Sequence, residues 1–241
     1  MADLFRDSKR NGLTVYFDIS SVNRQIMFSV LLKLSKLVDV KDQLSIVYCP
    51  AAYAEPDWAF PQIEGVGPVT PDFASYDADP LSPLCLVLGL GFEPGVSMGI
   101  ISQLEPAKAY CFWGGGVDDR FDDAVKRANF GFEFGSYNTQ AVKYSIVNPK
   151  AALQLLEGLV YGLCDDFHVV LVPMGPKIFS FITALVGLSY PGRVAIWRIQ
   201  QKRTYPADAQ PGGMVVWAKL NTALLLEATD RRRVSMDISN D

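Results

Sequence analysis

Residues 167–188 read FHVVLVPMGPKIFSFITALVGL, a short apolar run, a turn and a second apolar run. The first run, 167–173, is typical of a strand that is buried on both faces of a parallel sheet. The second run, 178–188, has the length of a helix of about three turns. Because the turn Pro173-Met-Gly-Pro-Lys177 separates them, neither can cross ~30 Å of hydrocarbon, and we expect the stretch to be buried core.

The same alternation recurs along the chain. Runs rich in Val, Ile, Tyr and Cys predict seven strands, at 13–18, 44–49, 84–90, 107–113, 142–147, 167–173 and 194–199. Helical spacing predicts five helices between them, at 22–37, 96–104, 118–129, 149–163 and 178–188. This pattern is typical of parallel strands joined by crossover helices. We therefore predict an α/β fold, a Rossmann-like, mostly parallel sheet with helices on both faces.

We expect a single α/β domain over residues 1–241. Residues 50–83 interrupt the alternation and hold seven of the fifteen prolines, which predicts a Pro- and aromatic-rich insertion. The aromatic residues of this insertion are Trp58, Phe60, Phe73 and Tyr76. Residues 200–205 and 214–220 predict a C-terminal antiparallel hairpin at one edge of the sheet, within a segment 200–241 that ends in a charged tail.

Composition limits the classes of function. The chain has 22 Lys and Arg against 26 Asp and Glu and no basic stripe, so we expect no long nucleic-acid partner. Four dispersed cysteines and an N-terminus without an apolar core predict a cytoplasmic protein that does not contact a membrane. His168 is the only histidine and lies at a strand start, which weakens serine-hydrolase and zinc-hydrolase interpretations.

Small and polar residues follow most of the predicted strands. Because ligands of open α/β sheets bind outside the carboxyl ends of the strands, we expect these residues to converge on one site. The candidate ligand-binding residues are Ser20, Ser21, Gly91, Glu93, Gly114, Gly115, Gly175 and Lys177.

The turn at Gly175-Pro176-Lys177 is the strongest of these candidates. Glycine lets the backbone approach an anion, and the lysine and a helix N-terminus supply positive potential. The turn lacks the GxxxxGK[ST] spacing of a Walker A loop, and Gly89-Leu90-Gly91 lacks the third glycine of a dinucleotide fingerprint. The alternative for this turn is a tight bend with a solvated lysine.

Gly175-Pro176-Lys177 together with Asp18-Ile19-Ser20-Ser21 resembles the CARF-type ligand-sensing domains of prokaryotic defence systems. The resemblance covers about residues 13–199 and departs from the doubled glycine and the threonine that usually precede the family's lysine. It implies that Ser20, Ser21, Gly175 and Lys177 line a nucleotide pocket, often at a homodimer interface.

Three hypotheses for function follow. The first is a sensor or accessory protein that binds a small anionic ligand, with a nucleotide as the expected class, and needs no cofactor. The second is a phosphodiesterase or nuclease that uses Mg²⁺ or Mn²⁺ held by Asp18, Glu93, Asp118 and Asp119. The third is a structural subunit that forms a homodimer or a protein complex through residues 50–83. Whether the chain catalyses a reaction stays open.

Overall fold

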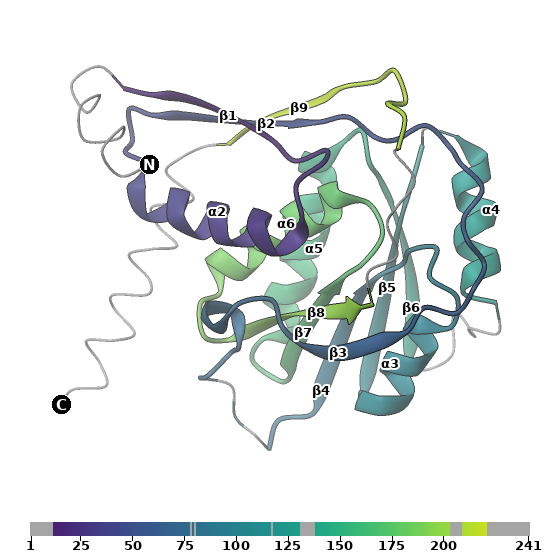
Figure 1. Cartoon of the computed structure of the whole chain (residues 1–241). Coiled ribbons are helices and arrows are strands. Elements are labelled where there is room, and N and C mark those ends of the chain that lie inside the picture. The colour runs from purple at the N-terminus through teal and green to yellow at the C-terminus, as the bar shows by residue number, and fades with distance from the viewer. Residues whose placement is uncertain are drawn as a thin grey trace.

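The structure is a computed structural model that describes residues 12–77, 79, 81–116, 118–130, 138–202 and 209–220 (Figure 1). Its strands are β1 (Thr14–Asp18), β2 (Gln43–Tyr48), β3 (Ile63–Pro68), β4 (Leu84–Gly89), β5 (Lys108–Gly115), β6 (Thr139–Ser145), β7 (His168–Pro173), β8 (Val194–Gln201) and β9 (Val216–Leu220). Its helices are α2 (Arg24–Leu37), η1 (Pro71–Phe73), α3 (Val96–Leu104), α4 (Asp119–Ala128), α5 (Pro149–Leu163) and α6 (Lys177–Ser189).

The main sheet has six strands in the order β3-β8-β7-β4-β5-β6. The five strands from β4 to β8 are parallel, and β3 runs antiparallel to β8. The chain starts in the centre at β4, moves outward to β6, and returns to β7 on the other side of β4. The α/β, Rossmann-like prediction is confirmed. The order reverses between β4 and β7, which makes their carboxyl ends the topological switch point.

Helices cover both faces of the main sheet. On one face, Leu86 and Val172 pack with the apolar residues of α3 and α4. On the other face, Val87 and Leu171 pack with α5, α6 and α2. Residues 178–188 of α6 are all buried, as expected for a helix that is apolar on all sides.

A second sheet, in the order β1-β2-β9, lies beyond the helices α2, α5 and α6 (Figure 1). The placement of the first two strands and the predicted hairpin was therefore wrong. The strand β9 is antiparallel at a sheet edge, as predicted, but its partner is β2. The free edge of β8 is already paired with β3, as in Val66 opposite Ile199, so β9 cannot pair there. Residues 203–208 and 221–241 lie outside the described part of the chain.

Residues 50–83 supply the strand β3 and the turn η1, neither of which the sequence predicted. Phe73 of η1 is buried, and its ring meets that of Phe28 edge to face at 5.5 Å. Phe60 and Tyr76 are exposed. The insertion therefore joins the main sheet and the core at β3 and η1. In the described part of the chain, no helix is both long and apolar enough to span a membrane.

Candidate functional site

The turns that follow β4 and β7 touch each other at the switch point. Gly175 has φ of +71°, and a Cβ atom there would lie 2.2 Å from the carbonyl oxygen of Leu90. A Cβ atom on Gly91 would lie 3.1 Å from the Gly175 nitrogen and 2.1 Å from Glu93 Oε2. Glycine is required at 175, where φ is positive and the Leu90 backbone is in the way, while at 91 an added carbon would displace the Glu93 side chain and press on the Gly175 backbone. Gly91 and Gly175, two of the candidate ligand-binding residues, therefore lie side by side at this edge.

Two cationic side chains, Arg24 and Lys177, connect α2 and the second sheet to this turn through hydrogen bonds. Arg24, the first residue of α2, donates from Nε to Ser180 Oγ at 2.9 Å and from Nη2 to the Gly175 carbonyl. Lys177 Nζ donates to the Ser20 carbonyl at 2.7 Å, so the turn after β1 reaches the site although β1 belongs to the second sheet. The Ser20 hydroxyl accepts a bond from the Cys49 backbone. Burial, followed by the neighbouring Arg24 charge, lowers the pKa of Lys177.

A cavity of about 230 Å³ lies over the carboxyl ends of β7 and β8, and we call it the cationic cavity. Its charged lining residues are Arg24, Lys177 and Arg198 against the single carboxylate of Glu93. Its other lining residues are Asn23, Gln25, Phe28, Val69, Val172, Pro173, Met174, Trp197, Ile199 and Gln201. Burial lowers the pKa of Arg24, and the nearby charge of Glu93 opposes this shift.

Arg198 lies within β8, opposite Gly67 of β3. Its Nε atom is buried and has no hydrogen-bond partner among the described residues. A buried guanidinium donor without an acceptor is costly, and an anion bound in the cationic cavity would satisfy it.

A second cavity, of about 200 Å³, lies over β4, β5 and β6, and we call it the apolar cavity. Its lining consists of Tyr48, Pro50, Ala51, Leu90, Gly91, Phe92, Glu93, Gly114, Gly115, Gly116, Asp118, Phe121, Val125, Ile146, Gly175 and Pro176. Gly114 and Gly115 therefore line the same cavity as Gly91, Glu93 and Gly175. Asp118 is already paired, because its Oδ2 lies 2.6 Å from Arg120 Nη2.

Glu93 belongs to the wall that the two cavities share. It interacts electrostatically with Arg24, but among the described residues its carboxylate has no hydrogen-bond or ion-pair partner. The turn after β7 forms the rest of this wall, with Gly175 and Pro176 on the apolar side and Lys177 on the cationic side. The wall therefore presents a carboxylate between an apolar and a positively charged space.

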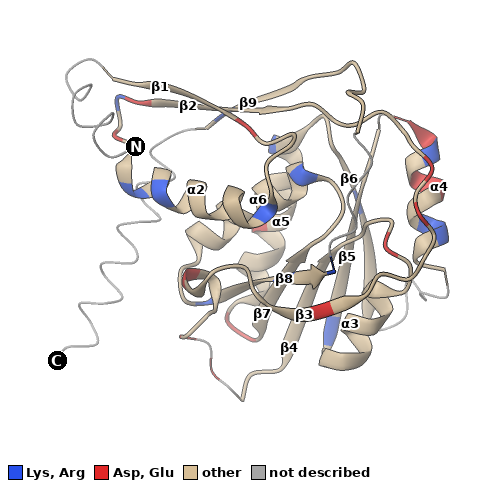
Figure 2. Cartoon of the chain, viewed as in Figure 1, with Lys and Arg blue, Asp and Glu red and all other residues tan. Residues whose placement is uncertain are grey.

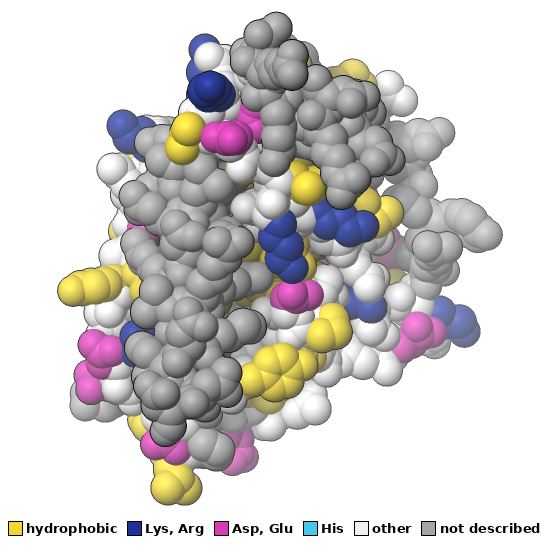
Figure 3. All heavy atoms as spheres, turned by 90° about the vertical axis from the view of Figure 1, so that its left-hand side faces the viewer, with side chains coloured by type: hydrophobic (Ala, Val, Ile, Leu, Met, Phe, Trp, Pro, Cys, Tyr) yellow, Lys and Arg dark blue, Asp and Glu magenta, His cyan; other side chains and the backbone are white. Residues whose placement is uncertain are grey.

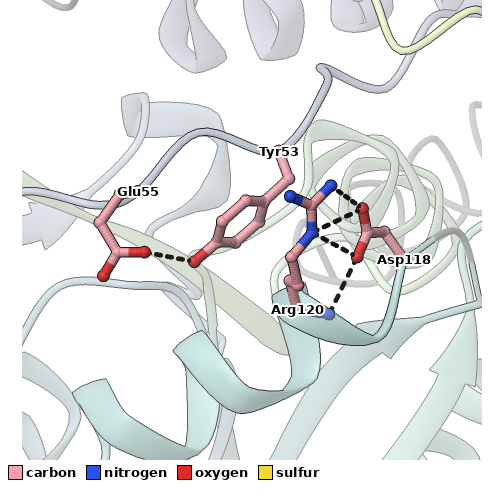
Figure 4. Close-up of polar contacts among 4 residues, drawn as sticks. All are labelled: Tyr53, Glu55, Asp118 and Arg120. Carbon is pink, nitrogen blue, oxygen red and sulfur yellow. Dashed lines mark hydrogen bonds and ion pairs between the residues drawn. The ribbon is translucent and has the colours of Figure 1, made fainter.

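A strap, residues 49–62, connects β2 to β3 and crosses α4 (Figure 1). Tyr53 donates to Glu55 at 2.8 Å, and the Arg120 guanidinium lies 4.7 Å from the centre of the Tyr53 ring while it binds Asp118 (Figure 4). Glu55 also accepts from Trp58 Nε1 at 2.8 Å, and Arg127 lies over the Trp58 ring. These exposed contacts hold the strap on α4 beside the apolar cavity.

The four carboxylates of the metal hypothesis do not come together. Among the described residues, no group of three or more His, Cys, Asp or Glu side chains is placed to hold a metal ion. Asp18 accepts from the Ser20 backbone, and Asp118 binds Arg120 and caps α4. Asp18 lies near enough to Lys177 to act on its charge, whereas Asp119 is the first residue of α4. The predicted Mg²⁺ or Mn²⁺ site is wrong for these residues.

Sequence reasoning missed Arg198 and Tyr48 and gave Arg24 no role. The available signal for Arg198 was a cation inside an otherwise apolar predicted strand, 194–199. Tyr48 gave no such signal, because tyrosine is an ordinary strand residue. Ser21 is exposed and lines neither cavity.

Positive and negative side chains alternate along α4, whereas the second sheet carries few charges (Figure 2). Of the two cavities described, the cationic cavity has three cationic side chains in its lining and the apolar cavity has none.

Comparison with known proteins gives no further guide to the site. No protein-family model matches the chain, and no curated protein matches its sequence.

Proposed function

We propose that this protein binds a small anionic ligand in the cationic cavity and acts as a sensor or accessory component. The observation that carries the proposal is the convergence of Arg24, Lys177 and Arg198 on one cavity, where the buried Nε of Arg198 has no acceptor among the described residues. Guanidinium groups bind phosphate and carboxylate oxygens through paired, charge-assisted hydrogen bonds. The cavity lies beside the switch point, where α/β sheets bind ligands.

The resemblance to CARF-type domains supports the same proposal and suggests nucleotides as probes. Lys177, which carries that resemblance, lines the cationic cavity, while Gly175 lies in its wall toward the apolar cavity. A homodimer that completes the site would agree with the resemblance and belongs to the proposal.

Calorimetric titration tests the proposal, with inorganic phosphate, mononucleotides and cyclic oligonucleotides as probes. We expect saturable binding of at least one probe and a more than tenfold loss of affinity in Arg198→Met, which removes an unpartnered donor and keeps the aliphatic stem. Lys150→Met, an exposed cation in the first turn of α5, is the matched control and should bind like the wild type. Absence of saturable binding to every probe, or equal affinity in Arg198→Met, would overturn the proposal.

A protein interface through residues 50–83 stays a prediction beside the proposed anion site. On the face drawn in Figure 3, the described hydrophobic side chains lie in small groups among charged and polar ones. Phe60 and Tyr76 are the exposed aromatic residues that such an interface would use. Sizing of Phe60→Ser and Tyr76→Ser variants tests it, and an unchanged oligomeric state in both would remove these residues from an interface.

A further inference from the structure

The apolar cavity shares a wall with the cationic cavity, and Glu93 lies in that wall. We propose that one ligand occupies both cavities, with its anionic group beside Arg198 and a flat, uncharged heteroaromatic ring in the apolar cavity. Tyr48 and Glu93 then recognise the polar edge of the ring. This inference rests on the proposed function and extends it from an anion to a nucleoside monophosphate.

The lining of the apolar cavity suits a flat ring. Phe92 and Phe121 both face it, and their own rings are stacked at 5.8 Å with planes 19° apart. Gly114, Gly115 and Gly116 present backbone instead of side chains on the β5 side. Aromatic and backbone surfaces of this kind bind the faces of planar groups.

Two polar groups in this apolar setting have no partner in the described part of the chain. Tyr48 lines the cavity with only 7% of its surface exposed, and its hydroxyl makes no hydrogen bond there. Burial raises the pKa of Tyr48 to about 12, so the hydroxyl is a neutral donor at pH 7. Glu93 is an unpaired acceptor in the same cavity. Neither the Tyr48 hydroxyl nor the Glu93 carboxylate is among the buried side-chain atoms of the described residues that lack a partner, so both face the open space of the cavity, where a ligand can bind them.

The hydroxyl of Tyr48 and the carboxylate of Glu93 together define which ligand groups fit the cavity. The ring must offer an acceptor to the Tyr48 hydroxyl and an N–H or amino donor to Glu93, a combination that nucleobases carry on one edge. A ribose hydroxyl could donate to Glu93 from the shared wall as well. An acyl chain would fill the apolar space but would leave both polar groups unpaired.

Size agrees with this arrangement. Cavities of about 200 and 230 Å³ are each small for a complete cofactor. Taken together they fall in the range of about 300–1,000 Å³ that is typical of small-molecule sites. A mononucleotide divides naturally into a ring and a phosphate that are separated by the sugar.

The test compares seven probes by calorimetry on the full chain: inorganic phosphate, ribose 5-phosphate, adenosine and the four common nucleoside monophosphates. At least one monophosphate should bind tenfold or more tightly than ribose 5-phosphate. Tyr48→Phe, which removes only the unpartnered hydroxyl, should weaken the binding of that monophosphate by about tenfold and leave the binding of inorganic phosphate unchanged. Tyr16→Phe is the matched control, because Tyr16 is exposed on the second sheet. Glu93→Gln provides a second variant with the same expected selectivity.

The possible failures are distinct. Equal affinity for ribose 5-phosphate and every monophosphate, with no effect of Tyr48→Phe, would overturn the ring assignment and leave the anion site in place. Binding of a nucleoside monophosphate that is sensitive to Tyr48→Phe but indifferent to Arg198→Met would overturn the shared ligand and the proposed anion site together. Absence of binding to all of these probes would overturn the ring assignment, and absence of binding to cyclic oligonucleotides as well would overturn the proposed anion site.

Discussion

Arg24 donates a hydrogen bond to the carbonyl of Gly175, a residue 151 positions later in the chain. This contact joins the start of α2 to the turn between β7 and α6. On its other side the same turn touches the Leu90 carbonyl and lines the apolar cavity. The arrangement of both cavities therefore depends on a turn that is held by α2 and by the turn after β4.

The Gly175 turn should tolerate no side chain. Gly175→Ala is expected to lower the free energy of unfolding by about 2–4 kcal/mol, because strain at positive φ adds to the clash with Leu90. Gly213→Ala is the matched control, since φ is +76° there and no atom lies within 4 Å of the added carbon. We expect this control to lose only about 1 kcal/mol. Urea unfolding measures both, and equal losses would contradict the importance of the close approach.

Removal of the Lys177 charge should not destabilise the free protein. Lys177→Met loses the bond to the Ser20 carbonyl but also relieves burial of the charge and repulsion from Arg24, which together lower the lysine's pKa. We expect an unchanged or slightly higher melting temperature at pH 7, within about 1 kcal/mol of the wild type. Lys150→Met is the exposed control. A drop of several degrees confined to Lys177→Met would show that the bond to Ser20 outweighs the cost of the charge.

His168 should titrate below its ordinary pKa. Burial lowers the pKa of His168 from 6.5, and its Nε2 has no partner among the described residues. Between the folded-state pKa and 6.5 the unfolded chain binds more protons, so stability is complete above this window, is lost as pH falls through it, and is constant below it. The single histidine gives one imidazole NMR signal to follow. His168→Gln should remove this part of the pH dependence, and a pKa above 6.5 would contradict the effect of burial.

The strap should loosen without global unfolding when Glu55 is changed. Glu55→Gln weakens the acceptor for Tyr53 and Trp58 and removes the ion pair with Arg127. Hydrogen exchange in residues 50–60 should become faster, while the melting temperature stays within about 2 °C, because exposed ion pairs add little stability. Glu64→Gln in β3 is the exposed control. Unchanged exchange in the strap would show that apolar contacts such as Tyr53 on Phe121 hold it instead.

The seven strands and five helices that local sequence patterns predict are all present in the structure, and their bounds agree within a few residues. The buried strand β7 and the helix α6 are largely apolar, so their burial follows from composition. The strand β3 was missed because Ile63–Pro68 holds two glycines and a proline and has no alternating pattern. It is a strand only because β8 offers it an edge.

The sequence by itself determined the elements and the residues that follow each strand, because hydrophobic periodicity and turn chemistry act over a few neighbouring positions. Those positions supplied Gly91, Glu93, Gly175 and Lys177 as candidates. Only the tertiary structure decided that β1 and β2 leave the main sheet, that β9 pairs with β2, and that Arg24 and Arg198 join Lys177 around one cavity. Strand partners and charge clusters are set by which edges and faces remain free after the core packs, and that competition involves residues more than 150 positions apart.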